Sequence, residues 1–166
     1  MRSALILILA CAALLPQAAH AQSAGGLTWT APAGWTSKGT APMRAATYPV
    51  DDAECVVYFF GQGQGGSVQA NIERWVGQFT VKGGHAMPKT GKRTVNGLEV
   101  TDLDISGTYA GMAGATPLDP KSDTRMLASI VENPGGNLYV KFTGPVKTVT
   151  ANEARFNQLV KSIRKQ

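Results

Sequence analysis

The dipeptide Asn96-Gly97 stands between two strand-like runs, and it constrains the fold more than any other feature of the sequence. An Asn-Gly pair favours the two-residue turn of a β-hairpin, because both residues readily adopt positive φ angles. Short turns also separate "MRAATYPV" from "ECVVYFF", through "DDA", and "TRMLASIVE" from "NLYVKFTGP", through "NPGG". Strands joined by such short turns pair antiparallel. We therefore expect an antiparallel sheet built largely from hairpins.

The individual strand-like runs predict how the sheet is covered. Residues 55–60 are apolar at nearly every position, which is typical of a central strand covered on both faces. The run 137–145 alternates instead, and it predicts one solvent-exposed face that carries Tyr139, Lys141 and Thr143. In the run 98–109 the apolar phase shifts between Val100 and Leu103, which indicates a β-bulge near Thr101 or Asp102.

Two segments have the apolar spacing of amphipathic helices. The first covers residues 67–79 and opens with Ser67 as its expected N-cap. The second lies at the C-terminus and opens with Thr150 and Glu153, which have the spacing of a capping box. We expect that second helix to continue to Arg164 and Lys165, where the helix dipole favours cations. The predicted fold class is α+β, with a single antiparallel sheet of about six to seven strands flanked by two main helices in an α/β/α sandwich.

Residues 1–21 have the layout of a secretory signal peptide. Arg2 precedes an apolar run, and Ala19 and Ala21 form the small-residue site before cleavage. An uncleaved anchor and a lipoprotein site at Cys11 are the less favoured alternatives. We therefore expect a periplasmic or secreted protein, with no transmembrane segment after cleavage and a single domain over residues 22–166 that begins with a short flexible lead, "QSAGG".

Charge and cysteine content narrow the partners. The net charge of +5 is carried by scattered lysines and arginines, without a basic run interleaved with aromatics, so nucleic acid is not an expected partner. After cleavage Cys55 is the only cysteine, which excludes an intramolecular disulfide. A small buried apolar residue is the favoured interpretation of Cys55; a reactive thiol or an intermolecular bridge is the alternative.

The glycines at 61, 63 and 66 match the G-x-G-x-x-G spacing of dinucleotide-binding loops. Such a loop needs an acidic residue about twenty positions further on, and "VKGGHAMPKTGKR" supplies none. We therefore interpret the glycines as a sharp turn between a strand and a helix. A weaker alternative is that free N–H groups near Ser67 attract an anion or an acidic partner, beside Gln62 and Gln64.

Catalytic and metal-binding patterns are sparse. His85 is the only histidine left after cleavage, and neither paired histidines nor a Cys-x-x-Cys motif occurs, so we expect no metal, no cofactor and no enzymatic activity. A nucleophilic pair of Cys55 and His85 is disfavoured because the thiol lies in a predicted core strand. Asp102 and Asp104 share one strand face. They are interpreted as solvent-facing charges rather than as a cation or acid-base site.

Three segments resemble the PsbP-like superfamily, which includes the Ran-binding Mog proteins and the DcrB-type envelope proteins. They are "WTAPAGW" at 29–35, "GQGQGGSVQANIERWVGQF" at 61–79, and "FTGP" followed by a helix that ends "LVKSIRK". The chain looks like an exported bacterial member of that superfamily. The resemblance implies an α/β/α sandwich and an accessory or binding role, and it carries no residue-by-residue site.

The function expected from these features is that of a non-catalytic exported accessory domain. We expect it to be a monomer and to bind a protein partner through loops and one sheet edge. The alternative is a carrier of a small apolar ligand in a groove between sheet and helix, lined by Trp75, Phe79 and Met112; a hydrolase is a third possibility. The candidate binding residues are Gln62, Gln64, Ser67, Arg74, Trp75 and Met112, together with the loop 110–125.

Overall fold

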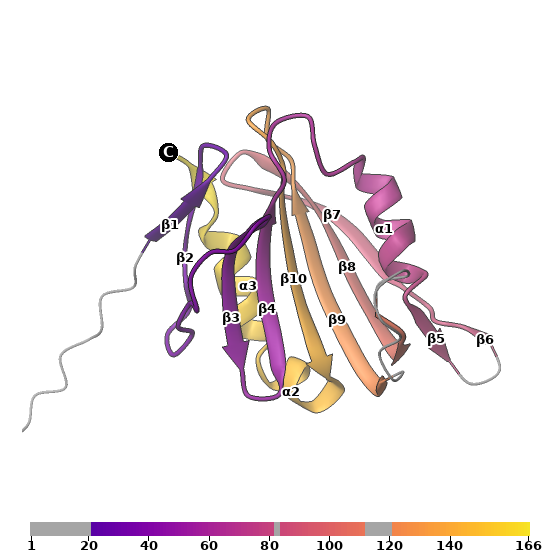
Figure 1. The fold of residues 1–166 in the computed structure, drawn as a ribbon. Helices are drawn as coiled ribbons and strands as arrows, with labels where there is room; N and C mark the ends of the chain where they lie inside the picture. Colours follow the sequence, from indigo (N-terminus) through magenta and orange to yellow (C-terminus); the bar gives the residue numbers. More distant parts are fainter. Residues whose placement is uncertain (1–20, 82–83, 112–120) are drawn as a thin grey trace, which may run out of the picture.

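The structure is a computed structural model and describes residues 21–81, 84–111 and 121–166 (Figure 1). The first half of the chain forms β1 (Ala21–Ala24), β2 (Leu27–Thr30), β3 (Arg44–Val50), β4 (Ala53–Phe59), α1 (Val68–Val76), β5 (Phe79–Val81) and β6 (Gly84–His85). The second half forms β7 (Lys89–Val95), β8 (Leu98–Tyr109), β9 (Lys121–Val131), β10 (Leu138–Pro145), α2 (Val146–Ala151), α3 (Glu153–Ser162) and β11 (Arg164–Lys165).

The strands form two sheets rather than the single sheet predicted. Over the described residues, the main sheet has eight strands in the order β3-β4-β10-β9-β8-β5-β6, with β7 paired to β8. The smaller sheet has the order β1-β2-β11. Neighbouring strands pair antiparallel in both, and the predicted hairpins β3–β4, β7–β8 and β9–β10 are confirmed. None of the helices in the described ranges has the length and apolar character needed to cross a bilayer.

The turn at Asn96-Gly97 has the backbone that the dipeptide predicted. Asn96 has a φ of 49° and Gly97 a φ of 77°, as a type I′ turn requires. The Asn96 side chain also reaches the end of α3, where its Nδ2 donates to the carbonyl oxygens of Lys161 (3.0 Å) and Ile163 (2.7 Å). The same residue therefore closes the hairpin and caps the last turn of a distant helix.

The expectation of a flexible lead is wrong, because residues 21–24 form strand β1. β1 pairs with β2 from Ala21 opposite Thr30 to Ala24 opposite Leu27. The Tyr48 hydroxyl donates a hydrogen bond to Gln22 and accepts one from the Trp29 indole nitrogen at 2.9 Å. A polar, glycine-containing segment is thus ordered by long-range partners that its own composition does not reveal.

The C-terminal segment forms two helices where one was predicted. α2 and α3 are separated at Asn152, whose side-chain Nδ2 donates to the Thr148 carbonyl oxygen at 3.0 Å. Thr150 lies within α2 and is not an N-cap. The break lets α2 pack on β9 and β10 while α3 packs on β2 and β9. Arg164 and Lys165 lie in β11, beside β2, and not in a helix.

The two faces of the main sheet support separate apolar clusters. One face packs against α2, α3 and the small sheet, through residues that include Phe142, Val140, Phe156 and Trp29. The other packs against α1, through residues that include Trp75, Ile105, Met126 and Tyr139. In Figure 1 the two helical layers accordingly lie on opposite sides of the sheet. The α+β class is confirmed, and the sandwich has an extra small sheet in one outer layer.

The predicted β-bulge near Thr101 is wrong. The pairing of β8 with β7 and with β9 runs without a register shift through residues 98–104. Leu98 and Val100 face the α2–α3 side, whereas Leu103 and Ile105 face α1. Simple alternation therefore explains the change of apolar phase, because the strand is buried first on one face and then on the other.

Cys55 is fully buried on the α2–α3 side of β4, as expected for a small apolar residue. Burial raises the pKa of its thiol well above the usual value, and the charge of Glu54 adds to the effect. Both factors suppress the thiolate that reacts with electrophiles.

We therefore predict that Cys55 is unreactive in the folded protein. In a Cys11→Ser background, the protein should release no thionitrobenzoate from Ellman's reagent until the chain is unfolded in guanidinium. A further Gln64→Cys replacement adds one exposed thiol and should react at once with one equivalent. Release of a second equivalent from the folded variant would contradict the burial of Cys55.

Candidate functional site

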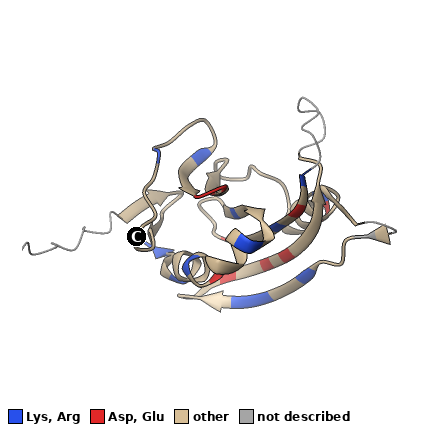
Figure 2. Ribbon diagram, turned by 90° about the horizontal axis from the view of Figure 1, so that it is seen from below, with Lys and Arg blue, Asp and Glu red and all other residues tan. Residues whose placement is uncertain are grey.

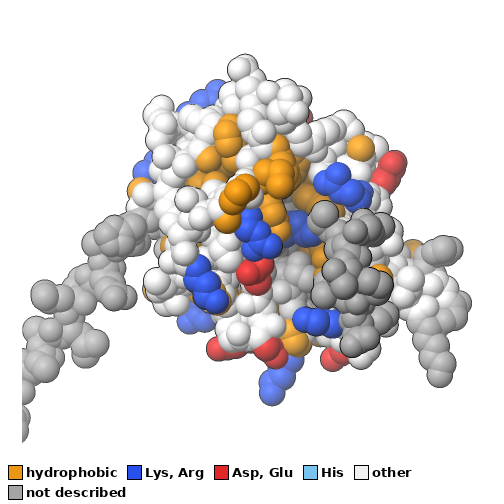
Figure 3. Space-filling model, viewed as in Figure 1, with side chains coloured by type: hydrophobic (Ala, Val, Ile, Leu, Met, Phe, Trp, Pro, Cys, Tyr) orange, Lys and Arg blue, Asp and Glu red, His pale blue; other side chains and the backbone are white. Residues whose placement is uncertain are grey.

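A groove of about 1020 Å³ lies on the α1 side of the main sheet, over the strands that α1 leaves uncovered (Figure 3). Strands β4, β10, β9 and β8 and the segment 38–44 contribute its walls. We call it the basic groove after four of the side chains that line it. Its basic and aromatic residues are Lys38, Arg44, Lys121, Lys141, Tyr58 and Tyr109.

One wall of the basic groove is held by Arg44 at the start of β3. Arg44 lies opposite Tyr58 in the β3–β4 pairing, and its guanidinium is 5.6 Å from the centre of the Tyr58 ring. The Arg44 Nη1 is 2.8 Å from the Glu54 Oε1. This half-exposed ion pair contributes little to stability but leaves Arg44 with a carboxylate partner. Burial raises the pKa of the Tyr58 hydroxyl, so this residue stays a neutral hydrogen-bonding group.

Lys141 lies at the floor of the groove. Strand alternation in β10 puts it on the α1 side between Tyr139 and Thr143, and its Nζ lies 5.4 Å from the centre of the Trp75 ring. Within the described ranges no carboxylate lies within ion-pair distance of it. Burial lowers the pKa of the Lys141 ammonium to about 8, helped by the charges of Arg74 and Arg44.

The face that carries Lys141 is not the open, solvated face that the sequence predicted. Tyr139 is only 1% exposed because α1 covers it, whereas Lys141 and Thr143 line the groove beyond the helix. The edge of α1 therefore divides one strand face into a packed half and an open half.

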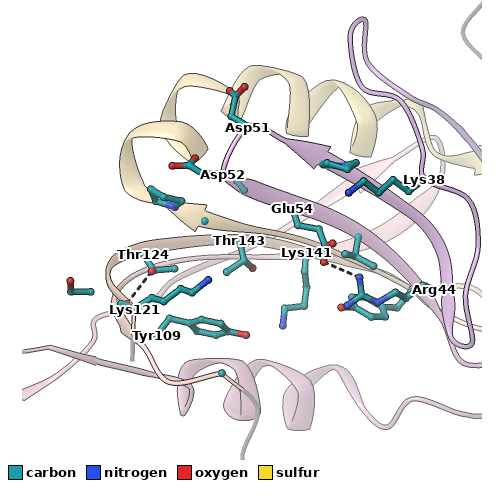
Figure 4. Close-up of a pocket in the computed structure, with 18 residues that line it drawn as sticks. Lys38, Arg44, Asp51, Asp52, Glu54, Tyr109, Lys121, Thr124, Lys141 and Thr143 are labelled. Atoms are coloured by element: carbon teal, nitrogen blue, oxygen red, sulfur yellow. Dashed lines mark hydrogen bonds and ion pairs between the residues drawn. The ribbon is translucent and has the colours of Figure 1, made fainter. Parts of the chain in front are cut away.

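Tyr109 and Lys121 approach Lys141 from β8 and β9. They are partners in the antiparallel register, so their backbones are adjacent although twelve positions separate them in the chain. Figure 4 shows the Tyr109 hydroxyl and the two lysine ammonium groups pointing into the same hollow. Burial raises the pKa of Tyr109, which keeps its hydroxyl protonated and able to donate.

Acidic side chains also line the groove, on the side formed by β3 and β4. Asp51 and Asp52 lie in the β3–β4 turn near α2 (Figure 4), and the Thr148 hydroxyl donates to the Asp52 Oδ1 at 2.6 Å. The groove thus carries charges of both signs. Its basic side chains can bind an anionic group, and its tyrosines can donate hydrogen bonds.

The predicted site residues fall into separate places. Arg74 and Trp75 adjoin the basic groove. The positive charge of Arg74 helps to lower the pKa of Lys141, and the centre of the Trp75 ring lies 5.4 Å from the Lys141 Nζ. Gln62, Gln64 and Ser67 lie outside it, in the exposed loop before α1. Met112 and most of the loop 110–125 fall at 112–120, outside the described residues. Trp75 and Phe79 are 4% and 3% exposed and pack on the sheet.

The glycine-rich loop has the structural role expected of it. Gly61, Gly63, Gly65 and Gly66 all have positive φ angles. At Gly65 a Cβ atom would lie 2.6 Å from the Tyr139 hydroxyl oxygen, so the chain can pass over that ring only without a side chain. Ser67 Oγ accepts from the Ala70 N–H at 3.2 Å, which confirms the predicted N-cap.

Asp102 and Asp104 lie on the opposite side of the sheet and pair with arginines. Arg93 contacts Asp102 from β7, the outer strand along which basic residues gather in Figure 2. Arg125 binds both oxygens of Asp104 at 2.9 Å and also reaches Glu153 at the start of α3. The two aspartates share a face as predicted, but they are partly buried and join strands to a helix rather than facing solvent freely.

The residues considered for metal or nucleophilic chemistry lie apart from the basic groove or at its margin. The described part of the chain contains no group of three or more histidine, cysteine or acidic side chains placed to hold a metal ion. Cys55 faces the α2–α3 cluster, away from the basic groove, and cannot reach a ligand bound there. The backbone of His85 lies in β6, at the end of the sheet path.

Sequence reasoning missed Lys141, Lys121, Tyr109 and Arg44 as a group. The alternation in β10 gave the correct face for Lys141, and a lysine between two apolar neighbours was the one available signal. The other members come from three different strands. Their convergence depends on strand order and on where α1 ends, which no local pattern records.

The comparisons with known proteins identify the fold. The solution structure of cyanobacterial PsbP (CyanoP) from Synechocystis sp. PCC 6803 matches with a TM-score of 0.57 and 12% sequence identity, over 96% of this chain and 99% of that one. A protein of unknown function from Pseudomonas aeruginosa, PA94, matches with a TM-score of 0.49 and 12% identity, over 87% of this chain and 94% of that one. No protein-family model and no curated protein matches the sequence. The fold is therefore PsbP-like, and at this identity the similarity extends to the fold alone.

Proposed function

We propose that the protein is a non-catalytic binding domain, exported to the periplasm or beyond, that holds a protein partner in the basic groove. The observation that supports this most directly is the half-covered sheet face. α1 packs over Tyr139, yet β4, β9 and β10 continue beyond it with aromatic and basic side chains at the surface. A concave, chemically varied surface of this kind is where binding is usually found.

The form of the groove favours a macromolecular partner over a small enclosed ligand. Its volume of about 1020 Å³ is at the upper limit of small-molecule pockets, which enclose most of their ligand. The groove instead opens along the sheet, with a rim formed by Lys38 and Asp51. Its basic side chains are complementary to an acidic segment of a partner.

Site-specific photo-crosslinking in the native bacterial host tests this proposal. A photoreactive amino acid replaces Lys38 at the rim of the groove, and the matched control replaces Gln158, which is exposed on α3 on the other side of the sheet. We expect one discrete protein adduct from position 38 and none from position 158. Two further positions, Gln64 in the loop before α1 and Lys92 on the edge strand β7, report on the other candidate surfaces.

The outcomes separate the candidate functions. Adducts from position 64 or 92 alone would move the binding surface away from the groove. Native mass spectrometry of the protein purified from the envelope gives the second measurement. A retained small molecule in place of a second chain would favour the ligand carrier. N-terminal sequencing of the same sample shows whether the chain begins at Gln22, as the signal peptide predicts.

A further inference from the structure

We infer that the floor of the basic groove is an oxyanion-binding site, in which Lys121, Lys141 and the Tyr109 hydroxyl hold a carboxylate or phosphate group of the ligand. This inference names the ligand chemistry of the groove and rests on the proposed function for the groove being the binding surface. An aspartate or glutamate side chain is how an unmodified protein partner presents such a group.

The charge at the floor of the groove is not balanced by the described residues. Arg44 has Glu54 as its partner, whereas none of the ion pairs among the described residues includes Lys121 or Lys141. Lys141 is partly buried, and its Nζ lies 5.4 Å from the centre of the Trp75 ring. Withdrawing an ammonium group from water without a counter-ion is unfavourable, and an anion that enters the groove reduces this penalty.

The donors at this position suit an oxyanion. Lys121 and Lys141 each supply an ammonium group, and the neutral Tyr109 supplies one O–H. They come from three consecutive strands of the sheet, β8, β9 and β10, so the scaffold that carries them is rigid. Charge-assisted hydrogen bonds from ammonium groups to carboxylate or phosphate oxygens are among the stronger polar contacts. A metal cation is disfavoured between Lys121 and Lys141 because the two ammonium groups repel it.

Titrations followed by ¹⁵N–¹H NMR test the inference. The probes are succinate, inorganic phosphate and the neutral analogue succinamide, each added at constant ionic strength set with sodium chloride. We expect both oxyanions to shift amide resonances around Tyr109, Lys121 and Lys141, and succinamide to leave them unchanged. The oxyanion that binds with the higher affinity identifies the source of the natural ligand group. Succinate would indicate acidic side chains, and phosphate would indicate a phosphorylated partner or free phosphate.

Two variants give the test its specificity. Lys141→Met removes the charge and keeps the aliphatic stem against Trp75, and it should weaken oxyanion binding about tenfold or more. Lys161→Met removes one exposed lysine from α3 on the other side of the sheet, and it should leave the affinity unchanged. Equal loss in both variants would show a response to net charge only and would overturn the inference.

The pH dependence supplies an independent readout. Lys141 is faced by Arg44, Glu54 and Tyr58 from β3 and β4, and by Arg74, Tyr109 and Lys121 from α1, β8 and β9. Its ammonium pKa of about 8 in the free protein rises when an anion binds, so the bound state holds more protons. Affinity for succinate should therefore be greatest below pH 8 and should fall as the pH rises above 8. Lys141→Met should remove this dependence, and an unchanged profile in that variant would contradict the assignment of Lys141.

The two proposals fail in different ways. If none of the oxyanions shifts the groove resonances, the oxyanion site is wrong, whereas an adduct from position 38 would still support the groove as a binding surface. If the oxyanions bind as expected but no adduct forms at position 38, the oxyanion site stands and the assignment of the groove as the protein-binding surface fails.

Discussion

Replacing Phe142 with alanine should lower the free energy of unfolding by about 3–5 kcal/mol. Phe142 is fully buried on the α2–α3 side of β10. Its ring centroid lies 5.3 Å from that of Trp35 and 6.3 Å from that of Phe156. The side chain thus joins the N-terminal segment, the main sheet and α3, and its loss would leave a cavity between three parts of the chain that cannot close by a small local shift.

Urea unfolding followed by tryptophan fluorescence measures this effect. Phe142→Leu is the graded control, and it should lose about 1.5 kcal/mol or less because it retains most of the apolar volume. If Phe142→Ala fails to fold, the leucine variant still reports on the site, with a smaller loss and an unchanged dependence on urea. A loss below about 1 kcal/mol for alanine would contradict the packing at Phe142.

The hairpins could be predicted because their determinants are local. Asn96-Gly97 adopts the positive φ angles that the dipeptide favours, and the hairpins that flank "DDA" and "NPGG" need only neighbouring residues to pair. The small sheet could not be predicted in this way. β11 pairs with β2 at Arg164 opposite Thr28, across almost the whole chain, and residues 164–165 carry no strand pattern of their own.

The helix boundary at Asn152 illustrates a conflict between local and tertiary signals. Thr150 and Glu153 have the spacing of a capping box, yet Thr150 lies inside α2, and its hydroxyl accepts from Arg125 at 3.0 Å. The break at Asn152 serves the packing of two helices on different strands. A local motif can therefore be present in the sequence and be used for another contact.

The candidate site was less predictable than the fold, for a geometric reason. Exposure and proximity to glycines made Gln62 and Gln64 attractive in the sequence, but Gln62 Nε2 donates to the Pro134 carbonyl oxygen at 3.1 Å and tethers one turn to another. The residues that converge in the basic groove, Arg44, Tyr109 and Lys141, are brought together only by strand order. Alternation along a strand gives the face of a residue, and it does not show where a covering helix stops.

Phe142 and Lys141 are neighbours in β10 and lie on opposite faces of the strand. We expect Phe142 to contribute to stability and Lys141 to contribute to binding. Phe142 points into the α2–α3 cluster, and Lys141 lines the groove. Lys141→Met should therefore keep the free energy of unfolding at or above that of the parent protein, because it removes an unpaired and partly buried charge, even though it weakens anion binding. A shared loss of stability would mean that the groove is part of the folding core, which its open face does not suggest.

Replacing Gly144 with alanine should lower the free energy of unfolding by about 1–3 kcal/mol, and replacing it with valine should lower it further. Gly144 lies in β10, where a Cβ atom would come within 2.7 Å of the Ala53 Cα in the neighbouring strand and closer still to the Ala53 Cβ. Because the clash involves backbone, a change of side-chain rotamer cannot relieve it. β4 and β10 would have to move apart at the end of their pairing, where the last partners are Thr143 and Glu54.

Gly91 provides the matched control, since it is also a strand glycine without a positive φ angle. It lies in β7, and nothing is within 4 Å of the position a Cβ would occupy. Gly91→Ala should be neutral or should stabilise the protein by up to about 1 kcal/mol, because alanine restricts the unfolded chain more than glycine does. A loss of unfolding free energy in Gly144→Ala, with none in Gly91→Ala, would show that glycine is required where β10 approaches β4 closely. Equal effects at both positions would instead assign it to a general cost of replacing glycine in this sheet.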